Sequence, residues 1–211
     1  MKSFIENHQY QYIKSQIENL LQSKLTTHDT AVTEAIKTLT QEKVTGLFGK
    51  LSEDQKQLVD QVQHVEDEAE AIFFLSRLKQ HVTPFPELHT DTIQSLFPKA
   101  KKLRLPDLES VDWNELSYFG WNDQGSGKKY IILFKDGKLI GIEGRTTFSQ
   151  KPGICSICHE QEDVNLFTTS VKRSSKEESI TRANYICRNS NTCNRNLKNI
   201  HPLHRFIDLM T

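Results

Sequence analysis

The sequence predicts an α+β protein of two domains, with an N-terminal helical bundle followed by a C-terminal α/β domain. Residues 1–83 contain no proline, and their apolar side chains recur at intervals of three and four, as a buried helix face requires. From Pro84 and Pro86 onward the pattern changes to short β-rich runs, and all the cysteines lie in the last third of the chain. Each proline removes a backbone donor and disfavours helix for the residue before it. We therefore predict domains at residues 1–83 and 84–211.

Four helices joined by short loops are predicted in the first domain. The first spans about residues 5–25, and the second follows Thr30 and ends at Gly49. Ser52 and Gln55 form a capping box for the third, and a fourth follows the acidic residues 66–70, which suit the positive end of a helix dipole. The side chains expected to face inward are, helix by helix, Tyr10, Ile13, Ile17, Leu20 and Leu21; Val32, Ile36, Leu39, Val44 and Leu47; Leu58, Val59, Val62 and Val65; and Ile72, Phe73, Leu75 and Leu78.

The second domain begins with a short predicted helix at residues 90–96, followed by a β-hairpin. Its strands are residues 130–134 and 139–142, joined through Asp136-Gly137, a favoured type I′ turn. The preceding Gly125-Ser126-Gly127-Lys128 lacks the first glycine of a phosphate-binding loop, and no predicted helix follows it. We interpret it as the approach to the hairpin.

The four cysteines form two pairs, Cys155-x2-Cys158 and Cys187-x5-Cys193, separated by about 28 residues. Two such pairs suit tetrahedral zinc, because each pair can reach the metal from one tight loop. Between and after them the sequence predicts a strand at 164–171, a polar loop at 172–178, a strand at 180–186 and a helix starting near Cys193. This order is that of a treble-clef zinc finger, at about residues 150–211, with one structural Zn²⁺.

Two other uses of the cysteines are less favoured. Disulfides are disfavoured in a reducing cytoplasm, and a thioredoxin-type redox pair would leave Cys187 and Cys193 without a role. His159, His201 and His204 are possible substitute ligands, but four thiolates already complete a structural site. Such a site keeps no open position for water, so we expect no enzymatic activity.

Composition excludes several other classes of protein. The chain is 36% hydrophobic and 26% charged, without an apolar run of about 18 residues, so a membrane protein is not expected. The amino terminus lacks the apolar stretch of a signal peptide, which predicts a cytoplasmic protein. Basic and acidic residues both total 27, which gives no electrostatic argument for a nucleic-acid partner. Basic residues that could still contact RNA are Lys101, Lys102, Arg104, Lys172, Arg173, Arg182, Arg188 and Arg195.

Several segments resemble the fusidic acid resistance proteins of Gram-positive bacteria, which bind elongation factor G. The matching segments run nearly end to end: His8-Gln9-Tyr10, Lys101-Lys102 up to Pro106, Phe119-Gly120-Trp121-Asn122, Cys155-Ser156-Ile157-Cys158, Asn165-Leu166-Phe167, Tyr185-Ile186-Cys187-Arg188, Cys193-Asn194 and Phe206-Ile207-Asp208. The segments around the cysteines are the most specific. The resemblance implies a monomer with the predicted two-domain fold, which binds elongation factor G mainly through its second domain.

The resemblance also implies a function and a contact surface. Family members release elongation factor G from ribosomes on which fusidic acid has locked it. The resemblance therefore implies that this protein acts on the ribosome indirectly, through the factor. By motif position, the residues that would contact the factor are Arg182, Tyr185, Phe206 and Ile154, and relatives can carry an aromatic ring at the position of Ile154. The alternative function is that of an RNA- or DNA-binding zinc protein acting at the ribosome or as a regulator. Steep weakening of a nucleic-acid complex by added salt would distinguish this alternative from binding to a protein.

Overall fold

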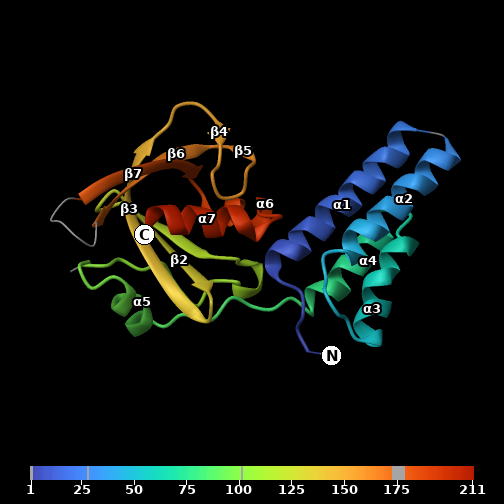
Figure 1. Ribbon diagram of the computed structural model, residues 1–211, viewed down its shortest axis with the longest axis horizontal. Coiled ribbons are helices and arrows are strands. Elements are labelled where there is room, and N and C mark those ends of the chain that lie inside the picture. The colour runs from blue at the N-terminus through green and yellow to red at the C-terminus, as the bar shows by residue number, and fades with distance from the viewer. Residues whose placement is uncertain (1, 28, 101, 173–178) are drawn as a thin grey trace. The chain divides into compact units, whose positions relative to one another are not determined.

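The computed structural model describes residues 2–27, 29–100, 102–172 and 179–211, which form two compact units, Met1–Thr83 and Pro84–Thr211. The first unit is helical, and the second combines a sheet with helices (Figure 1). The predicted α+β fold class is therefore confirmed. The predicted polar loop after Lys172, which includes Arg173, and the basic residue Lys101 lie outside the described residues.

Four α-helices build the first unit, as predicted, together with one short 3-10 turn that was not predicted. They are α1 (Asn7–Thr26), α2 (Thr30–Thr45), α3 (Glu53–Asp60), the turn η1 (Gln61–His64) and α4 (Glu68–Lys79). The capping box of α3 is present, since Ser52 Oγ accepts from Gln55 N at 3.3 Å and Gln55 Oε1 accepts from Ser52 N at 2.9 Å. However, α2 ends at Thr45 with Gly46 as its C-cap, so the prediction that Gly49 ends this helix is wrong.

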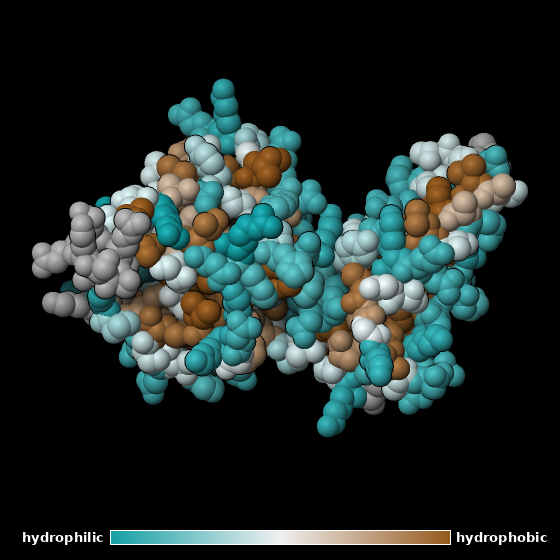
Figure 2. Space-filling view, viewed as in Figure 1, coloured by the Kyte–Doolittle hydropathy of each residue, from teal (hydrophilic) through white to brown (hydrophobic). Residues whose placement is uncertain are grey.

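The core of the first unit contains half of the 18 side chains predicted to face inward. Those that are buried are Ile13, Ile17, Leu20, Val44, Leu58, Val59, Val62, Val65 and Leu78, and Tyr10, Leu21, Leu47 and Leu75 are partly buried against them. The prediction fails on two helices, because Val32 and Leu39 of α2 and Ile72 and Phe73 of α4 are exposed. On α4 the buried stripe is Ala71, Phe74 and Leu78, which has helical spacing as well. Figure 2 shows hydrophobic residues at the surface over α2.

The second unit is organised around an antiparallel sheet of five strands in the order β1-β2-β3-β6-β7. Its strands are β1 (Phe119–Asp123), β2 (Lys128–Lys135), β3 (Lys138–Phe148), β6 (Val164–Lys172) and β7 (Ser179–Cys187), and a separate small sheet pairs β4 (Gly153–Ile154) with β5 (Gln161–Glu162). Asp136 and Gly137 have φ values of 52° and 74°, so the β2–β3 hairpin has the predicted type I′ turn. The segment from Gly125 to Lys128 joins β1 to β2, in agreement with its interpretation as the approach to the hairpin.

The side chains of β2 are buried on both faces of the sheet. The sheet separates two hydrophobic clusters. Ile131 and Leu133 face the cluster that holds the cysteines and helix α7 (Ile200–Met210). Tyr130 and Ile132 face a second cluster, in which Tyr130 stacks on Trp121 with ring centroids 5.0 Å apart. This second cluster is covered by α5 (Thr90–Leu96), the turn η2 (Trp113–Glu115) and the chain between them (Figure 1). One face of the sheet therefore packs against both the cysteines and α7.

Candidate metal centre

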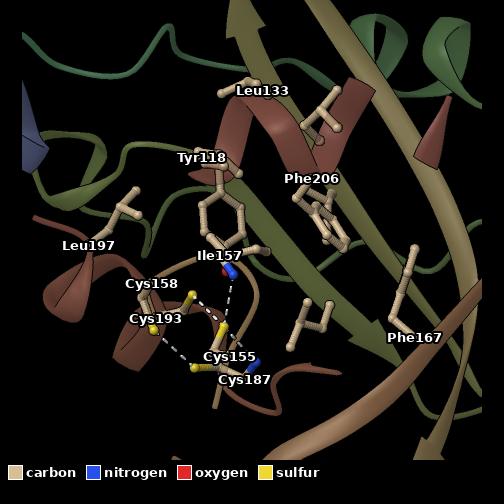
Figure 3. Close-up of a cluster of buried hydrophobic side chains, with 14 of the residues drawn as sticks. Tyr118, Leu133, Cys155, Ile157, Cys158, Phe167, Cys187, Cys193, Leu197 and Phe206 are labelled. Carbon is tan, nitrogen blue, oxygen red and sulfur yellow. Dashed lines mark hydrogen bonds between the residues drawn. The ribbon is translucent and has the colours of Figure 1, made fainter. Parts of the chain in front are cut away.

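Three separate parts of the chain bring the cysteines together. Cys155 and Cys158 lie in the loop between β4 and β5, Cys187 ends β7, and Cys193 lies in α6 (Ser190–Asn196). Figure 3 shows the four sulfur atoms grouped near the ring of Tyr118. All four Sγ atoms lie within 4.8 Å of one another, with 3.8 Å between Cys155 and Cys193 and 3.6 Å between Cys158 and Cys187.

These distances match a zinc site and exclude disulfides. Zinc bound tetrahedrally by thiolates at about 2.3 Å places the sulfur atoms about 3.8 Å from one another. A disulfide requires about 2.05 Å between sulfur atoms, and all four cysteines are free. All four are also buried, so the site is closed to solvent. The residues present therefore fit one structural zinc ion, as the sequence predicts.

The pKa values of Cys155, Cys187 and Cys193 also favour a cation at the centre of the site. Hydrogen bonds from Cys158, Cys187 and Cys193 lower the pKa of Cys155, whereas hydrogen bonding to Cys155 and Cys158 raises the pKa of Cys187. The pKa of Cys193 is also raised, mainly by hydrogen bonding to Cys155. Thiols in such contact cannot all ionise without a positive charge to offset their repulsion. A bound zinc ion would hold all of them as thiolates.

Backbone hydrogen bonds shape the loop that carries the first cysteine pair. The N–H groups of Ile157 and Cys187 each donate to Cys155 Sγ at 3.3 Å. The turn closes through His159, which has a φ of 62° and whose N–H donates to Cys155 O at 2.9 Å. Ser156 N donates to Tyr185 O at 2.8 Å, which ties this loop to the outer edge of β7. His159, His201 and His204 do not belong to the metal-binding group found among the described residues.

Sequence reasoning missed a buried lysine at the site. Lys129 is 1% exposed, and its Nζ donates to Cys187 O at 3.2 Å and to Arg188 O at 3.0 Å. Burial lowers the pKa of Lys129 to about 8, and the nearby thiols of Cys193, Cys187 and Cys155 oppose that shift. The sequence contained a signal for this. Lys129, Ile131 and Leu133 occupy every second position of one strand, so their side chains lie on the same buried face.

Asn194, next to the last cysteine, joins α6 to the start of β1. Its Oδ1 accepts from Ser117 N at 2.7 Å and Tyr118 N at 3.2 Å, and its Nδ2 donates to Tyr118 O and Ser190 O, both at 3.0 Å. Asn194 and Tyr118 are each 1% exposed, so the backbone N–H and carbonyl of Tyr118 have no water to replace the amide if it is removed. The side chain therefore fixes the helix that presents Cys193.

Asn194→Ala is expected to lower the free energy of unfolding by roughly 2 to 3 kcal/mol, because it leaves buried backbone groups without partners. Chemical denaturation of the zinc-loaded protein would measure this. Asn191→Ala, an exposed position on the same helix, is the control and should change stability by less than about 0.5 kcal/mol. Equal effects of the two substitutions would contradict the role of the Asn194 side chain in fixing α6.

Comparison with known proteins gives a match to a family model for each of the two units. Residues 4–86 match the family model for the elongation factor G-binding protein, N-terminal, and residues 93–206 match the FBP C-terminal treble-clef zinc-finger. This chain belongs to the family of elongation factor G-binding proteins. The second match coincides with the cysteine cluster and confirms the treble-clef zinc finger predicted from the cysteine spacing.

One solved structure has nearly the same length and fold. The structure of the fusidic acid resistance protein FusC matches with a TM-score of 0.83 and 27% sequence identity, covering 98% of this chain and 97% of that one. Comparison with curated protein sequences gave no match. No helix in the described part of the chain combines the length and the apolar character needed to cross a membrane.

Of the four contact residues predicted from the family motifs, two are well exposed. Tyr185 on β7 is 49% exposed and Ile154 on β4 is 61% exposed. The backbone hydrogen bond from Ser156 to Tyr185 brings the chain that follows Ile154 to the same edge of the sheet. These two side chains are therefore available to a protein partner.

The other two predicted contacts have structural partners instead. Phe206 is 2% exposed and packs against Phe167 with ring centroids 5.8 Å apart, so the structure places it in the core rather than on a contact surface. Arg182 donates through Nη1 to the carbonyl of Leu209 near the end of α7. Because residues three apart on a strand point to opposite faces, Arg182 and Tyr185 do not share one flat surface.

Proposed function

We propose that this protein binds elongation factor G and promotes its release from the ribosome, which protects translation from fusidic acid. The support is the match of both units to the family of elongation factor G-binding proteins, together with likeness to the fusidic acid resistance protein FusC over nearly the whole of both chains. The partner is a protein, and the ribosome is reached through it.

Release of the factor requires that this protein prefer one conformation of it. A ligand shifts an equilibrium only by the difference between its affinities for the two states. Moving a population from 1:99 to 99:1 requires a difference of about 10⁴-fold. We propose that the preferred conformation is one that the ribosome holds poorly, so that capture of the factor and its dissociation are the same event.

The surface that we propose for this contact lies beside the zinc centre and includes Tyr185 and Ile154. Both are exposed, and both are adjacent to segments that the cysteines hold in place. A side chain on a rigid element loses little conformational entropy when it binds. Tyrosine is also among the residue types most often found at the energetic centre of interfaces.

We propose that the protein acts by binding and not by catalysis. Four cysteines complete a tetrahedral zinc site and leave no position for a reactive water. All four sulfur ligands are buried in a hydrophobic cluster, where a substrate could not reach the metal. The zinc then has the role of a structural element that fixes the neighbouring strands.

The direct test is a sedimentation assay with ribosomes stalled by fusidic acid and elongation factor G. We expect a molar excess of this protein to move the factor from the ribosomal pellet to the supernatant. A pull-down with purified factor, without ribosomes, separates binding from release. Binding without release would contradict the release step alone, and failure of both would contradict the whole proposal.

Salt dependence distinguishes this function from nucleic-acid binding. A protein that contacts 6 to 10 phosphates loses about 10³- to 10⁵-fold in affinity between 50 and 200 mM salt. We expect the complex with elongation factor G to weaken far less over this range, because protein interfaces combine apolar and polar contacts. Tight, steeply salt-dependent binding to ribosomal RNA with no affinity for the factor would favour the alternative.

A further inference from the structure

Lys129 is a charged side chain on the hydrophobic face of the sheet that carries the cysteine cluster. It lies on β2 beside Ile131 and Leu133 and is 1% exposed. In the described part of the chain, no ion pair joins its ammonium to a carboxylate. Burial of an uncompensated charge is strongly unfavourable. The position therefore needs a compensating negative charge.

The hydrogen bonds of Lys129 lead to the end of the strand that carries a cysteine ligand. Nζ donates to the carbonyl oxygens of Cys187 and of Arg188, the residue after it. These contacts fix the backbone where β7 ends and the chain turns toward α6 and Cys193.

The charge of a loaded site supplies the compensation. Four thiolates and one Zn²⁺ carry a net charge of −2, enclosed in a cluster of apolar side chains. A cation beside the ligands offsets part of that charge where water cannot. Outer groups of this kind orient metal ligands and tune their electron density.

We propose that Lys129 is a positioning residue of the zinc centre, where its ammonium holds the backbone of Cys187 and offsets the negative charge of the four thiolates. The consequence is tighter zinc binding. The proposal concerns the metal site alone and does not depend on the proposed function in translation.

The test compares Lys129→Met with Lys128→Met in the full-length protein. Methionine keeps most of the volume of Lys129 but removes its charge and both of its hydrogen bonds. Lys128 is the adjacent lysine, but it is partly exposed and pairs with Glu143 at 2.9 Å. By competition with a chromogenic zinc chelator, we expect zinc affinity to fall at least tenfold in Lys129→Met and less than twofold in Lys128→Met. A fall of less than twofold in both would overturn the proposal.

A spectroscopic measurement separates the charge from a packing role. In the Co²⁺-substituted protein, loss of the neighbouring cation should raise the energy of the sulfur electrons and move the sulfur-to-cobalt charge-transfer band to longer wavelength. Weaker binding with an unmoved band would overturn the proposal, because it would reduce Lys129 to a structural role.

A second variant, Lys129→Gln, covers the case in which Lys129→Met does not fold. It keeps hydrogen-bond donors without the charge, and we expect the same shift of the cobalt band. If neither variant folds even in excess zinc, the proposal is also overturned, because saturating metal would compensate for weakened binding but not for a lost core residue.

Discussion

Cys187→Ser is expected to abolish stoichiometric zinc binding and to unfold much of the second unit. Cys187 is both a ligand and a member of a cluster that includes residues of β2, β6 and α7. Structural zinc contributes apparent binding free energies of about 10 to 16 kcal/mol in zinc-finger peptides, which is comparable to or above the whole stability of a typical domain. Loss of one ligand should therefore leave the cluster without its main support.

Metal analysis of the purified, reduced protein and thermal unfolding followed by circular dichroism would measure both effects. Ser156→Ala is the control, because Ser156 lies in the loop that carries Cys155 and Cys158 and its hydroxyl donates to Asn184 Oδ1 at 3.4 Å. The control should keep one zinc per chain and a thermal transition close to that of the parent. A Cys187→Ser protein that still carried one zinc per chain would refute the ligand assignment.

Tyr185→Ala is expected to weaken binding to elongation factor G by about 2 kcal/mol or more, which is roughly thirtyfold. The half-exposed ring on β7 is the best aromatic candidate beside the zinc centre, and its strand is held by Cys187. Titration calorimetry with purified factor would measure the change. The effect should appear mainly as faster dissociation, as is usual for interface substitutions.

Phe134→Ala provides the control, because Phe134 on β2 is 46% exposed, close to the exposure of Tyr185. It should leave the affinity for the factor unchanged. The Tyr185→Ala protein must also retain its zinc and its thermal transition, so that lost binding is not a result of unfolding. If that folded, zinc-loaded protein bound as tightly as the parent, Tyr185 would not belong to the contact surface.

The local signals in the sequence were sufficient for the four helices of the first unit, four of the strands and the metal ligands, but not for β1, β4 and β5. Ser52 with Gln55, and Asp136 with Gly137, adopt the predicted capping box and type I′ turn, because these geometries depend on a few neighbouring residues. The spacing of the cysteines indicated the treble clef for a similar reason, since metal chemistry restricts which ligand patterns can close a site.

The buried side of a helix could not be read in the same way. On α4, Phe73 and Phe74 are neighbours in the sequence, yet one is exposed and the other buried. Either could begin a stripe with helical spacing, so periodicity alone allowed two orientations. The choice depends on which stripe fits the surfaces of the neighbouring helices, and this is a property of packing between segments distant in the chain.

The features of the zinc site likewise fall into two groups, those that the sequence predicts and those that depend on the tertiary structure. Ligand identity, zinc and the order of strands and helix follow from the chain alone, because covalent spacing and backbone preference act locally. The roles of Lys129, Arg182 and Phe206 emerge only when β2, β7 and α7 are packed together, since each role is a contact between distant segments. The family motifs placed Phe206 among the contact residues, whereas the fold buries it against Phe167, because the free energy of burying a ring depends on what surrounds it and not on its neighbours in sequence.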